Sequence, residues 1–241
     1  MDDRSDLSAV FRFAVQLAVS FGLLALLAAQ VQRVDWTLIT LGVIAVVWIM
    51  NAYNFMDGSH GMAGFQGLFS GLFLAIVFTL EGSHGLAIPA LVIAAACGGF
   101  LPFNFPRARI FMGDSGSVPL GFMLAALMVL GLVQDVLSLP LAAMVLSVFL
   151  VDSTLTLLNR VIRGEQWYTA HKLHMYQRLI AQGWPHSRVL LLYQAINIMV
   201  VMPAILLAMM YPEYAWPITG FLALLLTAGW YTASLRLEVR T

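Results

Sequence analysis

Residues 86–103 read LAIPALVIAAACGGFLPF, eighteen residues in a row without a charged side chain. A helix that crosses the hydrocarbon core of a bilayer needs about 20 such residues. Polar turns flank the run, at residues 81–85 and from Asn104 onward. Because lipid offers the backbone no hydrogen-bond partners, a run of this kind folds as a helix. The stretch therefore predicts a transmembrane helix and an all-α membrane protein.

Seven further apolar stretches lie on either side of this run. The eight together are near residues 11–29, 38–50, 62–80, 86–103, 118–133, 136–158, 189–210 and 216–235. The second is short unless it continues into residues 51–55, which we expect. Tight connections, such as 30–36 and 212–214, suit antiparallel neighbours. We expect an all-α integral membrane protein, a polytopic bundle of about eight transmembrane helices that forms a single domain over residues 1–241.

The composition of the chain agrees with this class. Hydrophobic residues make up 61% of the chain and charged residues 10%, whereas soluble domains carry about 25% charged residues. The mean hydropathy is +0.89. Twelve basic and twelve acidic residues balance each other, so the chain has no global basic field and we expect no nucleic-acid partner. The single cysteine, Cys97, excludes an intrachain disulfide and is expected to be a small buried side chain.

The positive charges orient the predicted bundle. If the spans alternate, one face collects the N-terminus, the loops at 51–61, 104–117 and 159–188, and the C-terminal tail. Eleven of the twelve basic residues fall on or beside that face: Arg4, Arg12, Arg107, Arg109, Arg160, Arg163, Lys172, Arg178, Arg188, Arg236 and Arg240. Arg33 is alone on the other, so the first face is predicted to be cytoplasmic. The polar clusters also gather there, which places the expected active site on cytoplasmic loops.

Two polar clusters come early in the chain. Asp2-Asp3 precedes a span, where adjacent carboxylates could stabilise the helix dipole, hold a cation or accept a proton from a nucleophile. The second cluster is NAYNFMDGSHG at residues 51–61. Its Asn51 and Asn54 are three apart and share a helical face. An ordinary polar turn with a helix cap is the alternative, but two amides and the Asp57 carboxylate are more than a turn requires.

The third cluster is NFPRARIFMGDSGS at residues 104–117, ahead of an apolar helix. Ser117 is expected to be the N-cap of that helix, and free amides at a helix start favour an anion. Asp114, among small residues, could coordinate a Mg²⁺ whose other ligands are phosphate oxygens and waters. The neighbouring Arg107, Arg109 and Phe111 strengthen this interpretation.

The fourth cluster is the basic loop at residues 159–188. If it is helical, His171, His174 and Arg178 share a face and point at one anionic group. Simple sorting of positive charge is the alternative, and two histidines without a nearby cysteine make zinc unattractive. Asp152 lies within an apolar span, where a carboxylate is costly, so it is expected to face the bundle interior with a role that the sequence leaves open.

The order of these loops resembles the polyprenyl-phosphate N-acetylhexosamine-1-phosphate transferases over nearly the whole chain. The anchors are Asp2-Asp3, residues 51–61, residues 104–117 and the histidines at 171 and 174. Within that family, YNFMDG at residues 53–58 and AHKLHMYQ at residues 170–177 look more like the initiators of O-antigen and similar surface polysaccharides.

The resemblance implies a site residue by residue. Asn54 and Asp114 would place Mg²⁺, or Mn²⁺ in its stead, on the diphosphate of a UDP-N-acetylhexosamine, and Asp2 or Asp3 would assist the attacking polyprenyl phosphate. Asn104 and Phe111 would recognise uracil. The full set of implied catalytic residues is Asp2, Asp3, Asp57, His171 and His174, and the implied substrate-binding residues are Asn51, Asn104, Phe111, His60, Arg107 and Arg178. UMP would leave, and the protein would lie in the bacterial inner membrane, with a homodimer compatible with this arrangement.

The chain departs from the family in two places. Where the family has Asp-Gly-x-Asp-Gly, residues 57–61 read DGSHG, so the imidazole of His60 replaces a carboxylate that contacts the nucleotide. The family also carries several membrane helices before Asp2-Asp3, which we expect this chain to lack. An inactive homologue that acts as a lipid-binding scaffold is therefore the alternative function. A secondary transporter is a third class, which the placement of the polar residues at one membrane edge disfavours.

Overall fold

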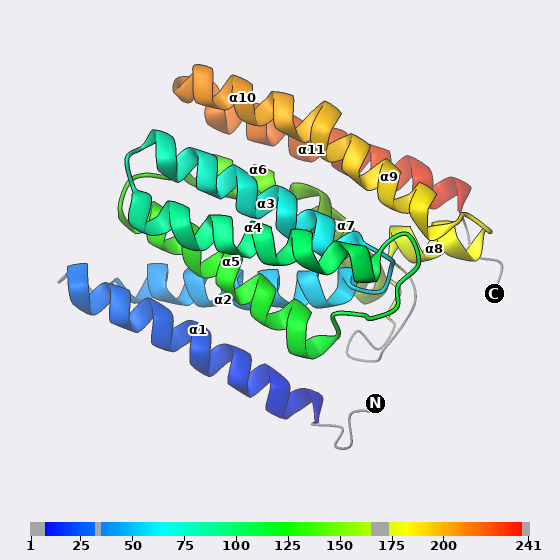
Figure 1. Ribbon diagram of the computed structural model, residues 1–241, viewed down its shortest axis with the longest axis horizontal. Helices are drawn as coiled ribbons and strands as arrows, with labels where there is room; N and C mark the ends of the chain where they lie inside the picture. Colours follow the sequence, from blue (N-terminus) through cyan, green and yellow to red (C-terminus); the bar gives the residue numbers. More distant parts are fainter. Residues whose placement is uncertain (1–7, 32–34, 165–173, 238–241) are drawn as a thin grey trace.

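The computed structural model describes residues 8–31, 35–164 and 174–237. Their regular structure is helical throughout (Figure 1). The helices are α1 (Ala9–Val31), α2 (Trp36–Met56), α3 (Met62–Leu80), α4 (His84–Asn104), α5 (Asp114–Val133), α6 (Leu139–Val145), α7 (Ser147–Ile162), α8 (Met175–Ala181), α9 (His186–Ile196), α10 (Met202–Met210) and α11 (Ala215–Arg236), with a π-helical segment at Asn197–Val201 between α9 and α10 and a 3-10 turn at Pro212–Tyr214.

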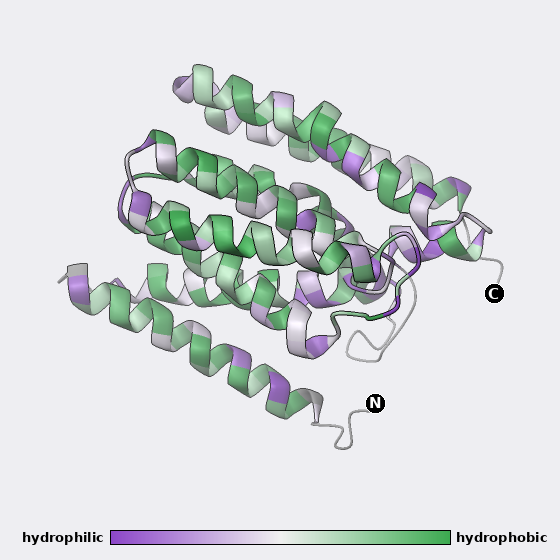
Figure 2. Ribbon diagram, in the orientation of Figure 1, coloured by the Kyte–Doolittle hydropathy of each residue, from purple (hydrophilic) through white to green (hydrophobic). Residues whose placement is uncertain are grey.

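Seven helical segments in the described part of the chain are long and apolar enough to cross a membrane, and an eighth is added if the bent pair α6 and α7 counts as one span. In Figure 2 the apolar residues run along the helices and the hydrophilic ones gather at their ends. Large apolar side chains such as Val10, Ile88 and Phe221 are exposed on the outer surface, which suits contact with lipid. The prediction of an all-α polytopic membrane protein is confirmed.

The predicted span at residues 136–158 is not one continuous helix. The chain breaks at Leu146, and α6 and α7 meet at 75°. The carbonyl of Val145, the last residue of α6, accepts a hydrogen bond of 3.0 Å from the buried amide of Gln66 on α3. Such a bond satisfies a backbone group where the helix is interrupted. Because the residues around the break are apolar except for Ser147, hydropathy does not reveal it.

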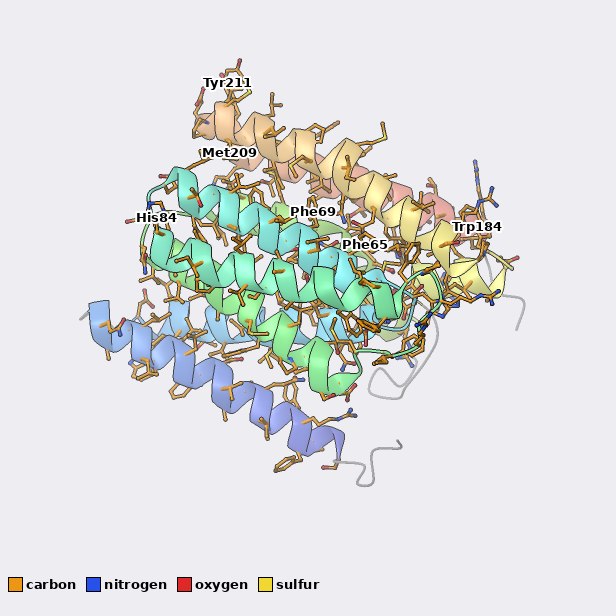
Figure 3. The ribbon with its side chains drawn as sticks, in the orientation of Figure 1. Phe65, Phe69, His84, Trp184, Met209 and Tyr211 are labelled. Atoms are coloured by element: carbon orange, nitrogen blue, oxygen red, sulfur yellow. The ribbon has the colours of Figure 1, made fainter. Side chains whose placement is uncertain are left out.

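The helices alternate in direction, so the loops with polar clusters meet at one end of the bundle (Figure 1). We call this the polar end and define it as residues 54–61, 104–114 and 174–188 with the first turn of α1. His84 and Tyr211 mark the opposite end, with its tight connections, whereas Trp184 lies at the polar end (Figure 3). The predicted grouping of these loops agrees with the arrangement.

Two glycines set the spacing between neighbouring helices. A Cβ on Gly121 of α5 would lie 2.9 Å from the Cα of Met50 on α2, and a Cβ on Gly71 of α3 would lie 3.0 Å from the carbonyl oxygen of Ala90 on α4. Backbones approach this closely only where a small residue stands at the crossing. The α2–α5 contact matters for function because α2 ends, and α5 begins, at the polar end.

Gly71→Ala is expected to destabilise the bundle. The added methyl group would meet backbone atoms of α4, which cannot turn away as a side chain can, and such overpacking costs about 1–3 kcal/mol. Gly99→Ala on α4 is the matched control, because open space surrounds that position and the same helix preference is gained. The apparent unfolding midpoint in detergent should fall for Gly71→Ala alone; equal midpoints for the two variants would contradict the close approach.

Candidate active site

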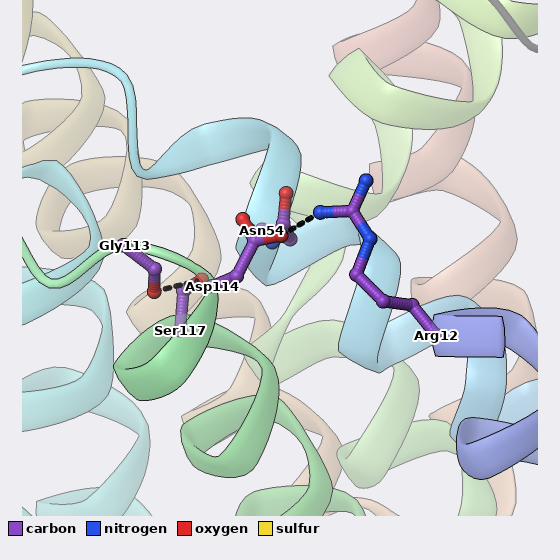
Figure 4. A network of polar contacts seen from close by, with 5 residues as sticks. All are labelled: Arg12, Asn54, Gly113, Asp114 and Ser117. Carbon is purple, nitrogen blue, oxygen red and sulfur yellow. Dashed lines mark hydrogen bonds and ion pairs between the residues drawn. The ribbon is translucent and has the colours of Figure 1, made fainter. Parts of the chain in front are cut away.

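Three helices bring polar side chains together at Asp114, the first residue of α5 (Figure 4). Asn54, near the end of α2, donates from Nδ2 to Asp114 Oδ1 at 2.7 Å. Arg12, on α1, forms an ion pair with Asp114 Oδ2. The side chains of Arg12 and Asp114 are 49% and 42% exposed, so a ligand can reach both. A carboxylate here also benefits from the free N–H groups of the first turn.

The start of α5 differs from the prediction. Ser117 was expected to be the N-cap, but α5 begins four residues earlier than that prediction implies and Gly113 is the cap. Gly113 has φ +60° and ψ −177°, a backbone conformation essentially restricted to glycine. Ser117 Oγ instead donates to the Gly113 carbonyl at 2.8 Å, as in Figure 4. The earlier start places Asp114 itself at the helix terminus.

Asp57 holds the loop before α5 in place. It follows the last residue of α2, is 9% exposed, and accepts a hydrogen bond of 2.7 Å at Oδ2 from the backbone N–H of Gly113. Burial raises the pKa of Asp57 to about 7, the Gly113 bond opposes this rise, and the nearby charge of Asp114 adds to it. The carboxyl group therefore exchanges its proton close to neutral pH.

The raised pKa of Asp57 predicts a pH-dependent stability. The folded protein keeps this proton up to about pH 7, whereas the ordinary value for the group is 3.8. Since the folded state binds more protons between these values, stability should fall as pH rises from about 4 through about 7. Asp57→Asn stays neutral and keeps an acceptor for Gly113. Between about pH 5 and about pH 8, the apparent unfolding midpoint should therefore fall further for the native protein than for the variant; parallel curves would refute this.

Asp114 and Asn54 fit the chemistry of a Mg²⁺ site. Carboxylate and amide oxygens are hard ligands, and Mg²⁺ commonly takes one or two carboxylates and fills its shell with water and substrate phosphates. The guanidinium of Arg12 beside Asp114 indicates that the position accepts positive charge. Across the described residues no group of three or more His, Cys, Asp or Glu lies close enough together to hold a metal ion.

A cleft of about 760 Å³ opens at the polar end. Its lining residues are His60, Pro102, Phe105, Pro106, Arg107, Ala108, Arg109, Pro185, His186 and Ser187. The His60 ring lies flat on the His186 ring, with centroids 4.0 Å apart and planes 9° apart, and Phe111 tilts against His60 at 5.7 Å. His60 Nδ1 lies 3.2 Å from the Pro106 carbonyl and can donate to it. The cleft thus offers aromatic faces beside guanidinium groups.

Two asparagines of the predicted site bond to neighbouring parts of the protein. Asn104 is 1% exposed, accepts from the N–H of Gly61 at 2.6 Å and donates to the Ile110 carbonyl at 2.8 Å. Gly61, with φ +77°, precedes α3. Asn51 donates to the side chain of Gln16 on α1 at 2.8 Å. In this conformation Asn104 ties two loops together and Asn51 ties α1 to α2.

The fourth cluster is only partly described. His171, like Asp2 and Asp3, lies outside the described residues. His174 is the N-cap of α8, is 3% exposed and stacks on Phe55 at 5.5 Å. Arg178 is 8% exposed, and its guanidinium lies 5.7 Å from the centre of the Trp230 ring. The helix therefore begins after His174.

Sequence reasoning missed the roles of two residues. Arg12 was interpreted only as one of the positive charges that orient the bundle. A guanidinium one turn inside an apolar helix is itself an indication of a functional site. Asp152 was expected to face the interior, which is confirmed by its 3% exposure, but its partners come from three other helices. Pairings over such sequence distances leave no local pattern.

Comparison with known proteins gives the context of this geometry. The sequence matches glycosyl transferase family 4 over residues 1–132. It is 31% identical over 220 residues to a probable undecaprenyl-phosphate N-acetylglucosaminyl 1-phosphate transferase of Bacillus subtilis, covering 86% of this chain and 61% of the relative. It is 33% identical over 227 residues to a decaprenyl-phosphate N-acetylglucosaminephosphotransferase of Mycobacterium tuberculosis, covering 80% and 56%.

A more distant similarity is to a phospho-N-acetylmuramoyl-pentapeptide-transferase of Moorella thermoacetica, 31% identical over 172 residues and covering 71% of this chain and 53% of the relative. The chain thus spans between 53% and 61% of the length of these curated relatives. All three relatives are named for transfer of a phosphorylated sugar.

Proposed function

The chain belongs to glycosyl transferase family 4, and from this premise we propose that it transfers an N-acetylhexosamine 1-phosphate from a UDP-sugar to a polyprenyl phosphate. An oxygen of the lipid phosphate attacks the β-phosphorus, the bond between that phosphorus and the bridging oxygen breaks, and UMP leaves with the electron pair. The products are a polyprenyl diphosphate sugar and UMP. The observation that carries the proposal is the meeting of Asp114, Asn54 and Arg12 from three helices at the polar end.

The residues of the network have separate tasks in this proposal. Asn54 and Asp114 would hold Mg²⁺, or Mn²⁺ in its stead, which neutralises charge on the diphosphate and the leaving group when bound. Arg12, already beside Asp114, turns its guanidinium to phosphate oxygens, a pairing that its planar donors favour. Asp57 fixes Gly113 and so sets the position of Asp114. Transfer of this kind depends on alignment and charge neutralisation more than on covalent chemistry.

The neighbouring cleft would take the nucleotide. Phe111 is 52% exposed, so one face of its ring is available to stack on uracil. Arg107 and Arg109 line the same region and carry charge that suits phosphates. His60 replaces the family carboxylate and packs on His186, so its contact with the base would be an imidazole contact. Asn104 supports this wall through its two hydrogen bonds.

The proposal extends to the sugar, the pathway and the membrane. Two of the relatives are named for N-acetylglucosamine, which supports an N-acetylhexosamine as the transferred sugar. The YNFMDG and AHKLHMYQ stretches favour initiation of O-antigen or a similar surface polysaccharide. The multi-pass fold and the excess of positive charge near the polar end support the bacterial inner membrane, with the polar end toward the cytoplasm.

Purified full-length protein supplied with polyprenyl phosphate, Mg²⁺ and either UDP-N-acetylglucosamine or UDP-N-acetylgalactosamine tests the proposal. UMP and lipid-linked sugar should form in equal amounts, detected by chromatography and mass spectrometry. Addition of EDTA should stop the reaction, and Mg²⁺ or Mn²⁺ should restore it. Absence of both products with every UDP-sugar tried would overturn the function, whereas product formation in EDTA would overturn the metal alone.

A further inference from the structure

Asp152, on α7, is a buried carboxylate that joins four helices. Its Oδ1 accepts hydrogen bonds from Thr156 Oγ1 at 3.1 Å, the backbone N–H of Met175 at 2.9 Å and Trp230 Nε1 at 3.0 Å, and its Oδ2 accepts one from Tyr193 OH at 2.7 Å. A buried carboxylate is costly unless such donors surround it, and bonds to an ionised acceptor are stronger than neutral ones. The four hydrogen bonds indicate that the Asp152 carboxylate holds particular groups of the neighbouring helices in place.

The bond to Met175 is the one that reaches the polar end. Met175 is the first residue of α8 and directly follows His174. The His174 ring stacks on Phe55 of α2 at 5.5 Å, with planes 26° apart, and the hydroxyl of Tyr176 donates to the Phe55 carbonyl at 2.9 Å. Phe55 stands between Asn54 and Asp57. The hydrogen bond from the Met175 N–H to Asp152 therefore sets where the His174 imidazole lies relative to the end of α2.

Helix α8 needs such an external anchor. It has seven residues, and a helix of this length is not stable by itself in water. Tyr176 attaches it to α2 and Asp152 attaches it to α7. With the bond to Asp152 released, the first turn of α8 could shift, and a displacement of about 1 Å at a reacting group can cost about 100-fold in rate.

We propose that Asp152 is a positioning residue for the transfer reaction: by accepting the Met175 N–H it holds His174 at the end of α2, where the diphosphate would bind. This inference rests on the proposed function for its catalytic consequence, but the positioning itself is independent of turnover. Tyr193 and Trp230 secure the carboxylate from α9 and α11, so the anchor is fixed to the bundle.

Met175→Pro removes the one hydrogen bond at issue. Proline is tolerated at the first position of a helix and lacks the N–H, and His174, with φ −60° and ψ 150°, already has the extended backbone that a residue before proline adopts. Met175→Ala is the matched control, because it loses the same buried side chain and keeps the N–H. Asp152→Ala removes the acceptor, and Tyr193→Phe removes another donor to the same carboxylate.

Cysteine labelling reports the position of residue 174. The chain contains one cysteine, Cys97, which is buried, so His174→Cys adds one further thiol to the full-length protein, and Cys97 alone gives the background rate. Its reaction with a polar maleimide should be slow in the otherwise native chain, since the site is 3% exposed. The rate should rise at least about 10-fold with Met175→Pro or Asp152→Ala and stay near the parent rate with Met175→Ala. Tyr193→Phe should raise it less than Met175→Pro does, because Trp230 still holds the carboxylate. Unchanged labelling in Met175→Pro protein would overturn the proposal.

Turnover of chains that retain His174 gives the second readout. The value of kcat should fall on the order of 100-fold with Met175→Pro and much less with Met175→Ala, at similar unfolding midpoints. Equal losses in both variants would overturn the positioning role. If no chain turns over, including the parent, the proposed function fails, and the labelling rates still decide whether Asp152 positions residue 174. If Asp152→Ala does not fold, the proline and alanine pair at Met175 decides.

Discussion

Replacing Asp114 with asparagine is expected to lower the rate of sugar-phosphate transfer on the order of 1,000-fold. The variant keeps the shape of the side chain and an acceptor for Asn54, but it loses the charge that pairs with Arg12 and that would hold the metal ion. Initial rates of UMP release at saturating Mg²⁺ measure the loss. Higher Mg²⁺ should recover part of it, since weaker coordination is the cause.

The matched control for this variant is Ser115→Ala, which alters the next, exposed residue of the same helical turn. It should leave the rate within about threefold. Both proteins should unfold at nearly the same temperature, because Asp114 is partly exposed. A rate for Asp114→Asn within tenfold of the native value would remove Asp114 from the proposed site.

Arg12→Ala is expected to lower turnover on the order of 100-fold. The guanidinium is the positive side chain in direct contact with Asp114, and without it phosphate oxygens beside the metal lose a paired donor. Arg12→Lys should retain part of the rate, because an ammonium supplies the charge without the planar pair of donors. Steady-state rates against UDP-sugar concentration separate the loss in kcat from the change in KM.

Arg163→Ala controls for simple loss of positive charge. Arg163 is exposed at the end of α7, and its removal changes the net charge by the same amount. It should lower the rate less than about threefold, since exposed charges are screened within about 8 Å at physiological salt. If both arginine variants lose the same activity, Arg12 acts through the general field and not through a contact.

Hydropathy and charge predicted the features that depend on single segments. The run at 86–103 became α4, His84–Asn104, because an apolar stretch in lipid has no alternative to a helix. The convergence of residues near 54, 114 and 174 at one end followed from counting alternating spans, since each span reverses the chain. Asn54 and Asp114 were predicted to meet at one ligand, and their 2.7 Å contact agrees with that proximity.

Features that depend on packing between distant segments were not predictable. The break at Leu146 lies in an apolar run and is accommodated by Gln66, 79 residues away from Val145. Ser117 carries the ordinary cap signal, but the backbone freedom of Gly113 moves the helix start upstream. The sequence showed that the Asp152 carboxylate is costly to bury. Its hydrogen bond with the Met175 N–H could be recognised only once the position of α8 was known. In each case a tertiary partner decided the local structure.

The crossing at Gly121 has a consequence for the choice of host lipid. Because α2 and α5 touch at their backbones there, a thicker or thinner bilayer tilts the two helices as one unit. The distance between the end of α2 and the start of α5 then does not depend on the length of the lipid acyl chains. Reconstitution into lipids of different chain length should change insertion and stability while leaving the geometry around Asp114 constant.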